Sequence, residues 1–163
     1  MAVALSLRDN STAGNLTSAD VSNGILYSSA DQSNSPGGSL IYKGADIIVR
    51  YNDFQASGGV TLSAVIEGKD NAGKYYPVGY QFNELWQTGK ELFHTLDVNP
   101  DSNWADAGSP NAIFPGELIG YVHHQQITLP ETWRVCIRIN EPSGSTFTSV
   151  ELDISAELMN KEA

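Results

Sequence analysis

Cysteine and positive charge are both scarce in this chain of 163 residues. Cys136 is the single cysteine, so no disulfide can form within the chain, and we expect it to be made for a reducing compartment. Nine Lys and Arg residues stand against nineteen Asp and Glu residues, which gives a formal net charge of −10. Proteins bind nucleic acids mainly through Lys and Arg, so this charge argues against a nucleic acid as a partner.

Long apolar runs are also missing from the chain. None approaches the roughly 18 residues that a membrane-spanning helix needs, and no basic cluster favours a membrane surface. The N-terminal stretch has no basic region, and its apolar run is too short for a secretory signal. We therefore expect no membrane partner and assembly in the cytoplasm of a host cell.

Helical periodicity is missing as well, because no apolar stripe of three helical turns occurs. Alternation with a period of two is clear instead. Val60, Leu62, Ala64 and Ile66 alternate with Thr61, Ser63, Val65 and Glu67, as expected of a half-buried strand. Further strands are predicted at 25–27, 39–42, 45–52, 74–80, 90–98, 117–122, 125–129, 133–139 and 148–154. Many short strands between turns predict an all-β fold, an antiparallel, jelly-roll-like β-sandwich.

Two hairpins are predicted from turn signals between these strands. The segments 60–67 and 74–80 flank the loop 69–73, and the segments 133–139 and 148–154 flank a Pro-Ser-Gly turn. In the second hairpin each strand has one apolar face. We expect Arg134 and Arg138 to lie opposite Glu151 and Asp153 as cross-strand ion pairs. The residues from 156 onward are expected to fray or form one weak helical turn.

The first 22 residues are polar and irregular, and we interpret them as an extended N-terminal arm in front of a sandwich domain at 23–163. A disordered terminus or a short strand is the alternative. Deleting 1–22 is predicted to leave folding intact and to weaken partner binding. The segment 99–116 is a long loop with three prolines, of a length that is usually functional or disordered.

The histidines and one acidic loop are the candidate ligands for a metal ion. His123 and His124 are adjacent, so on a strand they point to opposite faces, and His94 is remote in sequence. The segment 97–101 resembles the opening of a calcium loop, but it lacks the required glycine and the glutamate at the twelfth position. We therefore predict no metal and no cofactor.

Two acidic residues and the single cysteine are the candidates for catalysis. Glu151 and Asp153 are two residues apart on one strand face, a spacing that a hydrolase acting on glycosides can use. Pairing with arginines explains the same residues without catalysis. Cys136 lies between Arg134 and Arg138, but no base is near it in sequence to activate the thiol. We predict that the chain has no catalytic residue and is not an enzyme.

Since neither a metal site nor a catalytic site is predicted, we expect the chain to act by binding the surface of a partner. Trp86 and Trp104 lie outside the regular strands, where tryptophans anchor interfaces, stack on sugar rings or close the ends of a sandwich. The arm contributes the few large apolar side chains of an otherwise polar segment. The candidate interface residues are Val3, Leu5, Leu7, Arg8, Leu16, Trp86 and Trp104.

Five segments carry a resemblance to a known group of proteins. They are the polar run 29–34, the strand and turn 59–70, the return 72–76, the segment 129–135 and the strand 148–150. In this order they resemble small structural proteins of tailed bacteriophages, over about half of the chain. The chain departs from the compact pattern by its longer N-terminal arm and by an insertion.

The insertion covers roughly residues 82–125. The resemblance implies a decoration or cement protein that binds the outer surface of a capsid and stabilises it. The implied partners are the major capsid protein or other virion subunits, and many symmetric copies or a homo-oligomer are implied as well. The alternative is a tail or fibre adhesin or a carbohydrate-binding module, which a glycan array with the Trp86→Ala and Trp104→Ala variants would test.

Overall fold

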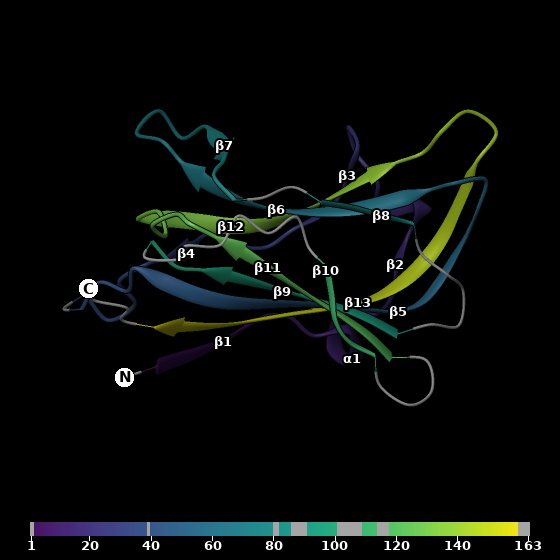
Figure 1. The fold of residues 1–163 in the computed structure, drawn as a ribbon. Helices are drawn as coiled ribbons and strands as arrows, with labels where there is room; N and C mark the ends of the chain where they lie inside the picture. Colours follow the sequence, from purple (N-terminus) through teal and green to yellow (C-terminus); the bar gives the residue numbers. More distant parts are fainter. Residues whose placement is uncertain are drawn as a thin grey trace.

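Two β-sheets stacked face to face make up most of the molecule (Figure 1). The computed structural model describes residues 2–38, 40–79, 82–85, 91–100, 109–113 and 118–159. The elements in chain order are β1 (Ala2–Arg8), α1 (Asn10–Ala13), β2 (Leu16–Thr17), the 3-10 helix η1 (Ser18–Asp20), β3 (Ile25–Ser28), β4 (Gln32–Ser33), β5 (Gly44–Ser57), β6 (Thr61–Lys69), β7 (Tyr75–Pro77), β8 (Phe82–Leu85), β9 (Glu91–Val98), β10 (Ser109–Ile113), β11 (Leu118–Gln125), β12 (Thr132–Asn140) and β13 (Thr146–Met159).

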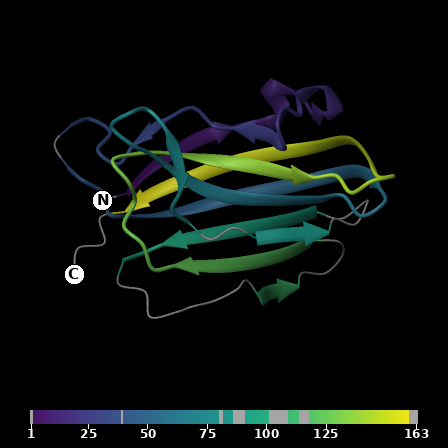
Figure 2. The same cartoon turned by 90° about the horizontal axis from the view of Figure 1, so that it is seen from above.

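The larger sheet has the strand order β1-β13-β5-β9-β11-β10, and β2 also pairs with β13. The smaller sheet has the order β3-β12-β6-β7, with β4 on β12 and β8 on β6. Figure 2 shows β1 and β10 on opposite sides of the larger sheet. The predicted all-β sandwich is confirmed. One pair of strands differs from the predicted antiparallel pattern, because β9 and β11 run parallel. No helix in the described part of the chain is both long and apolar enough to cross a membrane.

The core lies between the sheets and follows the alternation seen in the sequence. Along β5, Ile47, Val49 and Tyr51 are buried while Ile48 and Arg50 are exposed. In β13 the residues Leu152, Ile154, Ala156 and Leu158 are buried in the same alternating way, and from the smaller sheet come Leu62, Ile66, Trp133, Val135 and Ile137. A strand in a two-layer sandwich buries every second side chain, which is why alternation predicts strands such as β5 and β13. β6 departs from this pattern and from the half-buried strand predicted for it, because all of its residues from Leu62 to Gly68 are buried.

The hairpin predicted for 60–80 is confirmed. β6 and β7 pair antiparallel, with Lys69 opposite Tyr75. Asp70 closes the turn, because its side chain accepts hydrogen bonds from the backbone N–H groups of Ala72 (2.9 Å) and Lys74 (2.8 Å). This is the turn chemistry for which Asp is favoured.

The second predicted hairpin is wrong, because β12 and β13 belong to different sheets. The connection between them crosses from the smaller sheet to the larger one. A similar corner at Gly58 and Gly59 joins β5 to β6, and a Cβ atom on Gly58 would lie 2.7 Å from the Cα atom of Ser145. The two corners therefore pack against each other. Alternation identifies the apolar face of a strand but not the sheet to which the strand belongs.

Several predicted boundaries also need correction. The predicted strand at 39–42 is not formed at 40–42. The strand predicted at 117–122 extends to Gln125 as β11, and the separate strand predicted at 125–129 is not formed at 126–129. The predicted loop 99–116 contains β10, which pairs with β11. The end of the chain, expected to fray from residue 156, continues as β13 to Met159 because β5 and β1 flank it on both sides.

Candidate functional site

The predicted N-terminal arm lies against the sandwich as part of the larger sheet. β1 pairs antiparallel with β13, and β2 pairs with β13 further along. The prediction that 1–22 is an extended arm outside the sandwich is therefore corrected for the strands β1 and β2. β1 forms a strand because its apolar residues alternate with small or polar ones and because β13 offers it an edge with which to pair. The division into an arm and a domain at 23–163 as independent folding units stays a prediction.

Side chains alternate along β1. Val3, Leu5 and Leu7 are half-buried and pack on the core, whereas Ala4 and Ser6 are exposed. β1 is the last strand in the order of its sheet, and within the described residues no strand pairs with its outer edge. We call this outer edge, from Val3 to Leu7, the β1 edge. Its backbone groups are available to a further strand, except that the carbonyl oxygen of Leu7 accepts a hydrogen bond from the Tyr27 hydroxyl.

Arg8 ends β1 and is 7% exposed. Its guanidinium donates hydrogen bonds to the carbonyl oxygens of Leu152 and Gly14 and to Oδ1 of Asn10. It also lies over the ring of Tyr27, 5.3 Å from the ring centre. A buried guanidinium is held by carbonyl acceptors and an aromatic face in this way only where the surrounding backbone is fixed. Arg8 therefore ties the end of β1 to β13, to the residue after α1 and to β3.

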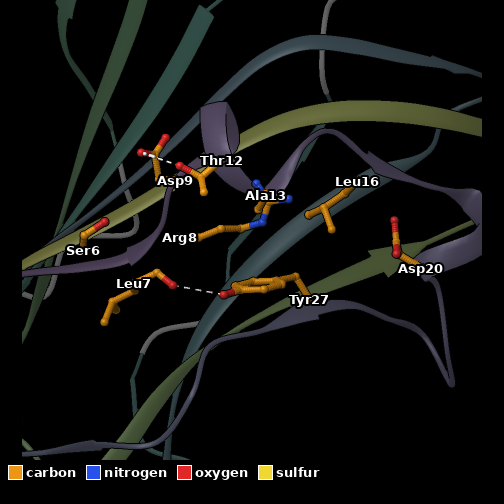
Figure 3. Close-up of a pocket in the computed structure, with 9 residues that line it drawn as sticks. All are labelled: Ser6, Leu7, Arg8, Asp9, Thr12, Ala13, Leu16, Asp20 and Tyr27. Carbon is orange, nitrogen blue, oxygen red and sulfur yellow. Dashed lines mark hydrogen bonds between the residues drawn. The ribbon is translucent and has the colours of Figure 1, made fainter.

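Tyr27 connects the two sheets beside this arginine. Its hydroxyl donates a hydrogen bond to the carbonyl oxygen of Leu7 at 3.1 Å (Figure 3). Burial raises the pKa of the Tyr27 hydroxyl above its ordinary value, and the nearby positive charge of Arg8 acts in the opposite direction. The hydroxyl therefore stays protonated and remains a donor at neutral pH.

The short turn after β1 is fixed by its own polar side chains. Asp9 caps α1 by accepting a hydrogen bond from the N–H of Ser11, and hydrogen bonds from Ser11 hold the pKa of the Asp9 carboxyl below its usual range. The N–H of Asn10 donates to Asp153 at 2.7 Å. Thr17 and Asp20 then form a capping box around η1. The segment between β1 and β3 is therefore ordered by local hydrogen bonds and by β13.

A pocket of about 570 Å³ opens beside the end of β1 (Figure 3). It lies where β1, α1, β2 and η1 of one layer meet Tyr27 of the other. Its lining residues are Ser6, Leu7, Arg8, Asp9, Thr12, Ala13, Leu16, Asp20 and Tyr27. The pocket and the β1 edge together form one partly apolar side of the molecule.

The structure brings together five of the seven predicted interface residues on this side. Val3, Leu5 and Leu7 are half-buried, while Arg8 and Leu16 are each 7% exposed and serve mainly the chain's own packing. Trp86 and Trp104 lie outside the described residues. That any of the seven contacts a partner stays a prediction. Tyr27 belongs to the same side and was missed, since nothing in the sequence indicates that β3 lies next to β1.

The predicted ion pairs of Arg134 and Arg138 with Glu151 and Asp153 are wrong. Both arginines instead bind Glu67 of β6, at 2.7 Å and 3.2 Å. β6 is the direct neighbour of β12, with Arg134 opposite Glu67, whereas β13 lies in the other sheet. Arg134 also covers the ring of Tyr75, with its guanidinium carbon 3.4 Å from the ring centre.

The other candidate chemical groups give no cluster in the described part of the chain. Among the described residues, no group of three or more His, Cys, Asp or Glu residues is arranged to hold a metal ion. The side chains of His94, His123 and His124 lie outside that part. The Cys136 thiol is buried, and its sulfur accepts a weak hydrogen bond from the Ser28 hydroxyl at 3.7 Å.

Comparisons with known proteins give two weak structural likenesses. No family model matches the chain, and no curated protein matches it. A mutant VP2 protein of infectious bursal disease virus, from derived T=1 particles, matches with a TM-score of 0.42 and 12% identity over 98% of this chain and 29% of that chain. A structure of the Gt strain of the same virus matches with a TM-score of 0.39 and 12% identity, over 100% of this chain and 32% of that chain. The chain thus spans less than a third of the chains it matches, and with TM-scores this low its function has to be argued from its own residues.

Proposed function

We propose that this protein is a structural component of a bacteriophage virion that binds the outer surface of the capsid and stabilises it. The β1 edge is the observation that carries the proposal. It is an accessible strand edge of a large sheet, bordered by half-buried apolar side chains and a pocket. An edge of this kind binds a partner by adding a strand, with backbone hydrogen bonds supplying affinity.

The sequence resemblance to small structural proteins of tailed phages supports the same function. The resembling segments 59–70 and 129–135 fall mainly in β6 and β12, the two central strands of the smaller sheet. The resemblance therefore concerns the framework of the sandwich. β1 belongs to the part in which this chain departs from the compact pattern, so it supplies contact area that the compact pattern lacks.

The charge of the chain suits a protein present in many copies. A net charge of −10 keeps free subunits soluble, since they repel each other. A capsid offers many equivalent binding sites, so many copies of this chain bind to it. When neighbouring copies also contact each other, modest individual contacts add up to a long-lived assembly.

Co-sedimentation tests the proposal. Purified protein is mixed with phage capsids that lack their outer decoration, and the bound amount is measured as the protein concentration rises. The proposal predicts saturation at a fixed number of copies for each capsid. No binding at micromolar concentrations, or binding that rises without saturation, would contradict it.

Two variants locate the contact. The double variant Ala4→Lys/Ser6→Lys places charges on exposed positions of β1, and it is expected to weaken capsid binding at least tenfold if the β1 edge makes the contact, a loss of about 1.4 kcal/mol. The control is Ser155→Lys, an exposed position directly opposite Ser6 but on β13, one strand further from the edge. Equal binding by both variants would show that the contact lies elsewhere.

A further inference from the structure

The β1 edge differs from the other strand edges that the structure describes. Natural sheets protect their edges with short strands, prolines, bulges or charges, since a bare edge pairs with other chains. β10, at the opposite side of the larger sheet, contains Pro110 and a shift of register beside it. In the smaller sheet, β7 has three residues and ends in Pro77, and β3 has four residues and a shift of register.

β1 has none of these protections over most of its length. It has seven residues, and its register with β13 is regular from Ala2 to Ser6. The positions from 2 to 7 contain no charged residue and no proline. Such an edge either pairs with another strand in the working assembly or promotes aggregation.

The residue pattern of β1 is complementary to itself. If two copies pair antiparallel with Leu5 opposite Leu5, then Val3 falls opposite Leu7 and Ala4 falls opposite Ser6. Residues directly opposite each other point to the same face of a sheet. The half-buried apolar side chains of one copy therefore meet those of the other, and the small exposed side chains meet each other.

The net charge of the chain also favours a second copy of the chain as the partner at the β1 edge. Two copies of a chain with a net charge of −10 repel each other over most surfaces, so they associate best where charge is absent. The β1 edge is such a place. Arg8 and Asp9 follow it, but the Arg8 guanidinium is turned inward onto Leu152, Gly14 and Tyr27.

We propose that β1 pairs antiparallel with β1 of a second copy of this chain, about a twofold axis at Leu5. The larger sheets of the two copies then join into one continuous sheet, and the interface is the same patch on both copies. This inference rests on the proposed function in taking the β1 edge as a contact surface of the assembled particle. The edge then joins neighbouring copies of this chain on the capsid, and Ala4→Lys/Ser6→Lys weakens capsid binding by separating these copies.

Charge variants test both the pairing and its register. In the proposed register, Ala4→Lys/Ser6→Lys places a lysine opposite a lysine at two positions across the axis, which destabilises the pair. Ala4→Glu/Ser6→Lys places a glutamate opposite a lysine at the same two positions. Analytical ultracentrifugation of the full chain is expected to show a dimer for the wild type and for Ala4→Glu/Ser6→Lys, and a dissociation constant at least tenfold higher for Ala4→Lys/Ser6→Lys.

The control is again Ser155→Lys, which is expected to dimerise like the wild type. Circular dichroism and thermal unfolding of each variant show that the sandwich is intact, since both substituted side chains are exposed. A wild-type chain that is monomeric at all concentrations would overturn the inference. Equal dissociation constants for the two double variants would overturn it as well.

The capsid experiment separates this inference from the proposed function. A chain that is monomeric but saturates capsids keeps the proposed function and refutes the dimer, leaving a capsid strand as the occupant of the β1 edge. A chain that dimerises as predicted but binds no capsid keeps the dimer and refutes the proposed function.

Discussion

Glu67 shows at the scale of single residues how this sandwich accommodates charge. Its side chain is 5% exposed and accepts hydrogen bonds from Arg134 and Arg138, whose side chains are 17% and 39% exposed. A buried carboxylate is stable only when it is paired, so the two arginines allow a charge to lie within the smaller sheet.

Replacing Glu67 by Gln should therefore destabilise the fold. The amide cannot satisfy two guanidinium groups, and we expect a loss of about 1–3 kcal/mol, reduced from the value for a fully buried pair because Arg138 is partly exposed. Urea unfolding measures the loss. The control is Asp31→Asn, which removes an ion pair to Lys69 whose partners are both 33% exposed, and it should cost less than about 1 kcal/mol. Equal losses would show that burial does not distinguish the two sites.

Cys136 gives a second prediction at this scale. Burial, and after it the negative charge of Glu67, raise the pKa of the Cys136 thiol above its ordinary value. The folded chain therefore holds the thiol proton more tightly than the unfolded chain. The resulting contribution to stability is complete below the pKa of the unfolded chain and is lost as the pH rises through the pKa of the folded chain.

At neutral and mildly alkaline pH the thiol should be protonated and inert. A thiol reagent such as Ellman's reagent is expected to modify the native chain no faster than the chain unfolds, and to react at once in denaturant. Rapid modification of the native chain at neutral pH would contradict the burial of this residue.

At the scale of elements, the two corners between the sheets fix the path of the chain. Gly58 has a φ of 78° and packs against Ser145, while Gly59 has a φ of 83° and has no neighbouring atom within 4 Å of an added Cβ atom. Both positions require a conformation that favours glycine, but only Gly58 lies in close contact with the other corner.

Gly58→Ala should consequently destabilise the fold more than Gly59→Ala. The second substitution carries only the strain of a left-handed backbone, about 1–2 kcal/mol. The first adds a clash with the backbone of Ser145, which we expect to cost about 1–3 kcal/mol more. Thermal unfolding of the two variants measures the difference. If both variants lose the same stability, the corners do not pack as the structure has them.

The elements also show what the sequence can and cannot predict. Period-two alternation predicted β5, β6, β12 and β13. In β5 and β13 buried residues alternate with more exposed ones, whereas β6, predicted to be half-buried, is buried on both faces from Leu62 to Gly68. The same alternation could not assign β12 and β13 to different sheets, because a turn signal does not say whether the chain reverses within a sheet or crosses between sheets.

The residues of the candidate site could be predicted from the sequence only in part, because a local pattern does not show which strands pair. Val3, Leu5 and Leu7 stood out as apolar residues in a polar segment, and the structure places them together on one side of the sandwich. Their pairing with β13 depends on residues about 150 positions away in the chain, which no local pattern reveals. For the same reason, Tyr27 could not be assigned to this side.

At the scale of the whole molecule, the N-terminal segment belongs to the fold. β1 and β2 together cover one edge of β13, and Arg8 joins this segment to β13 and β3. Removing residues 1–22 deletes both strands and exposes the core beside them.

We therefore expect the deletion of 1–22 to lower the midpoint of thermal unfolding, contrary to the expectation that follows from the sequence alone. A control that deletes the last residues after Met159 removes no described strand and should change the midpoint little. An unchanged midpoint for the first deletion would show that the segment is an arm whose contacts do not stabilise the sandwich.

A stabilised capsid should hold its packaged DNA up to a higher temperature. The most direct test is the temperature at which capsids release their packaged DNA, measured with and without saturating amounts of this protein. A protein that binds the capsid and stabilises it should raise the release temperature, and the gain should reach a plateau at the copy number found by co-sedimentation. A release temperature that does not change while the capsids are fully occupied would contradict the stabilising role.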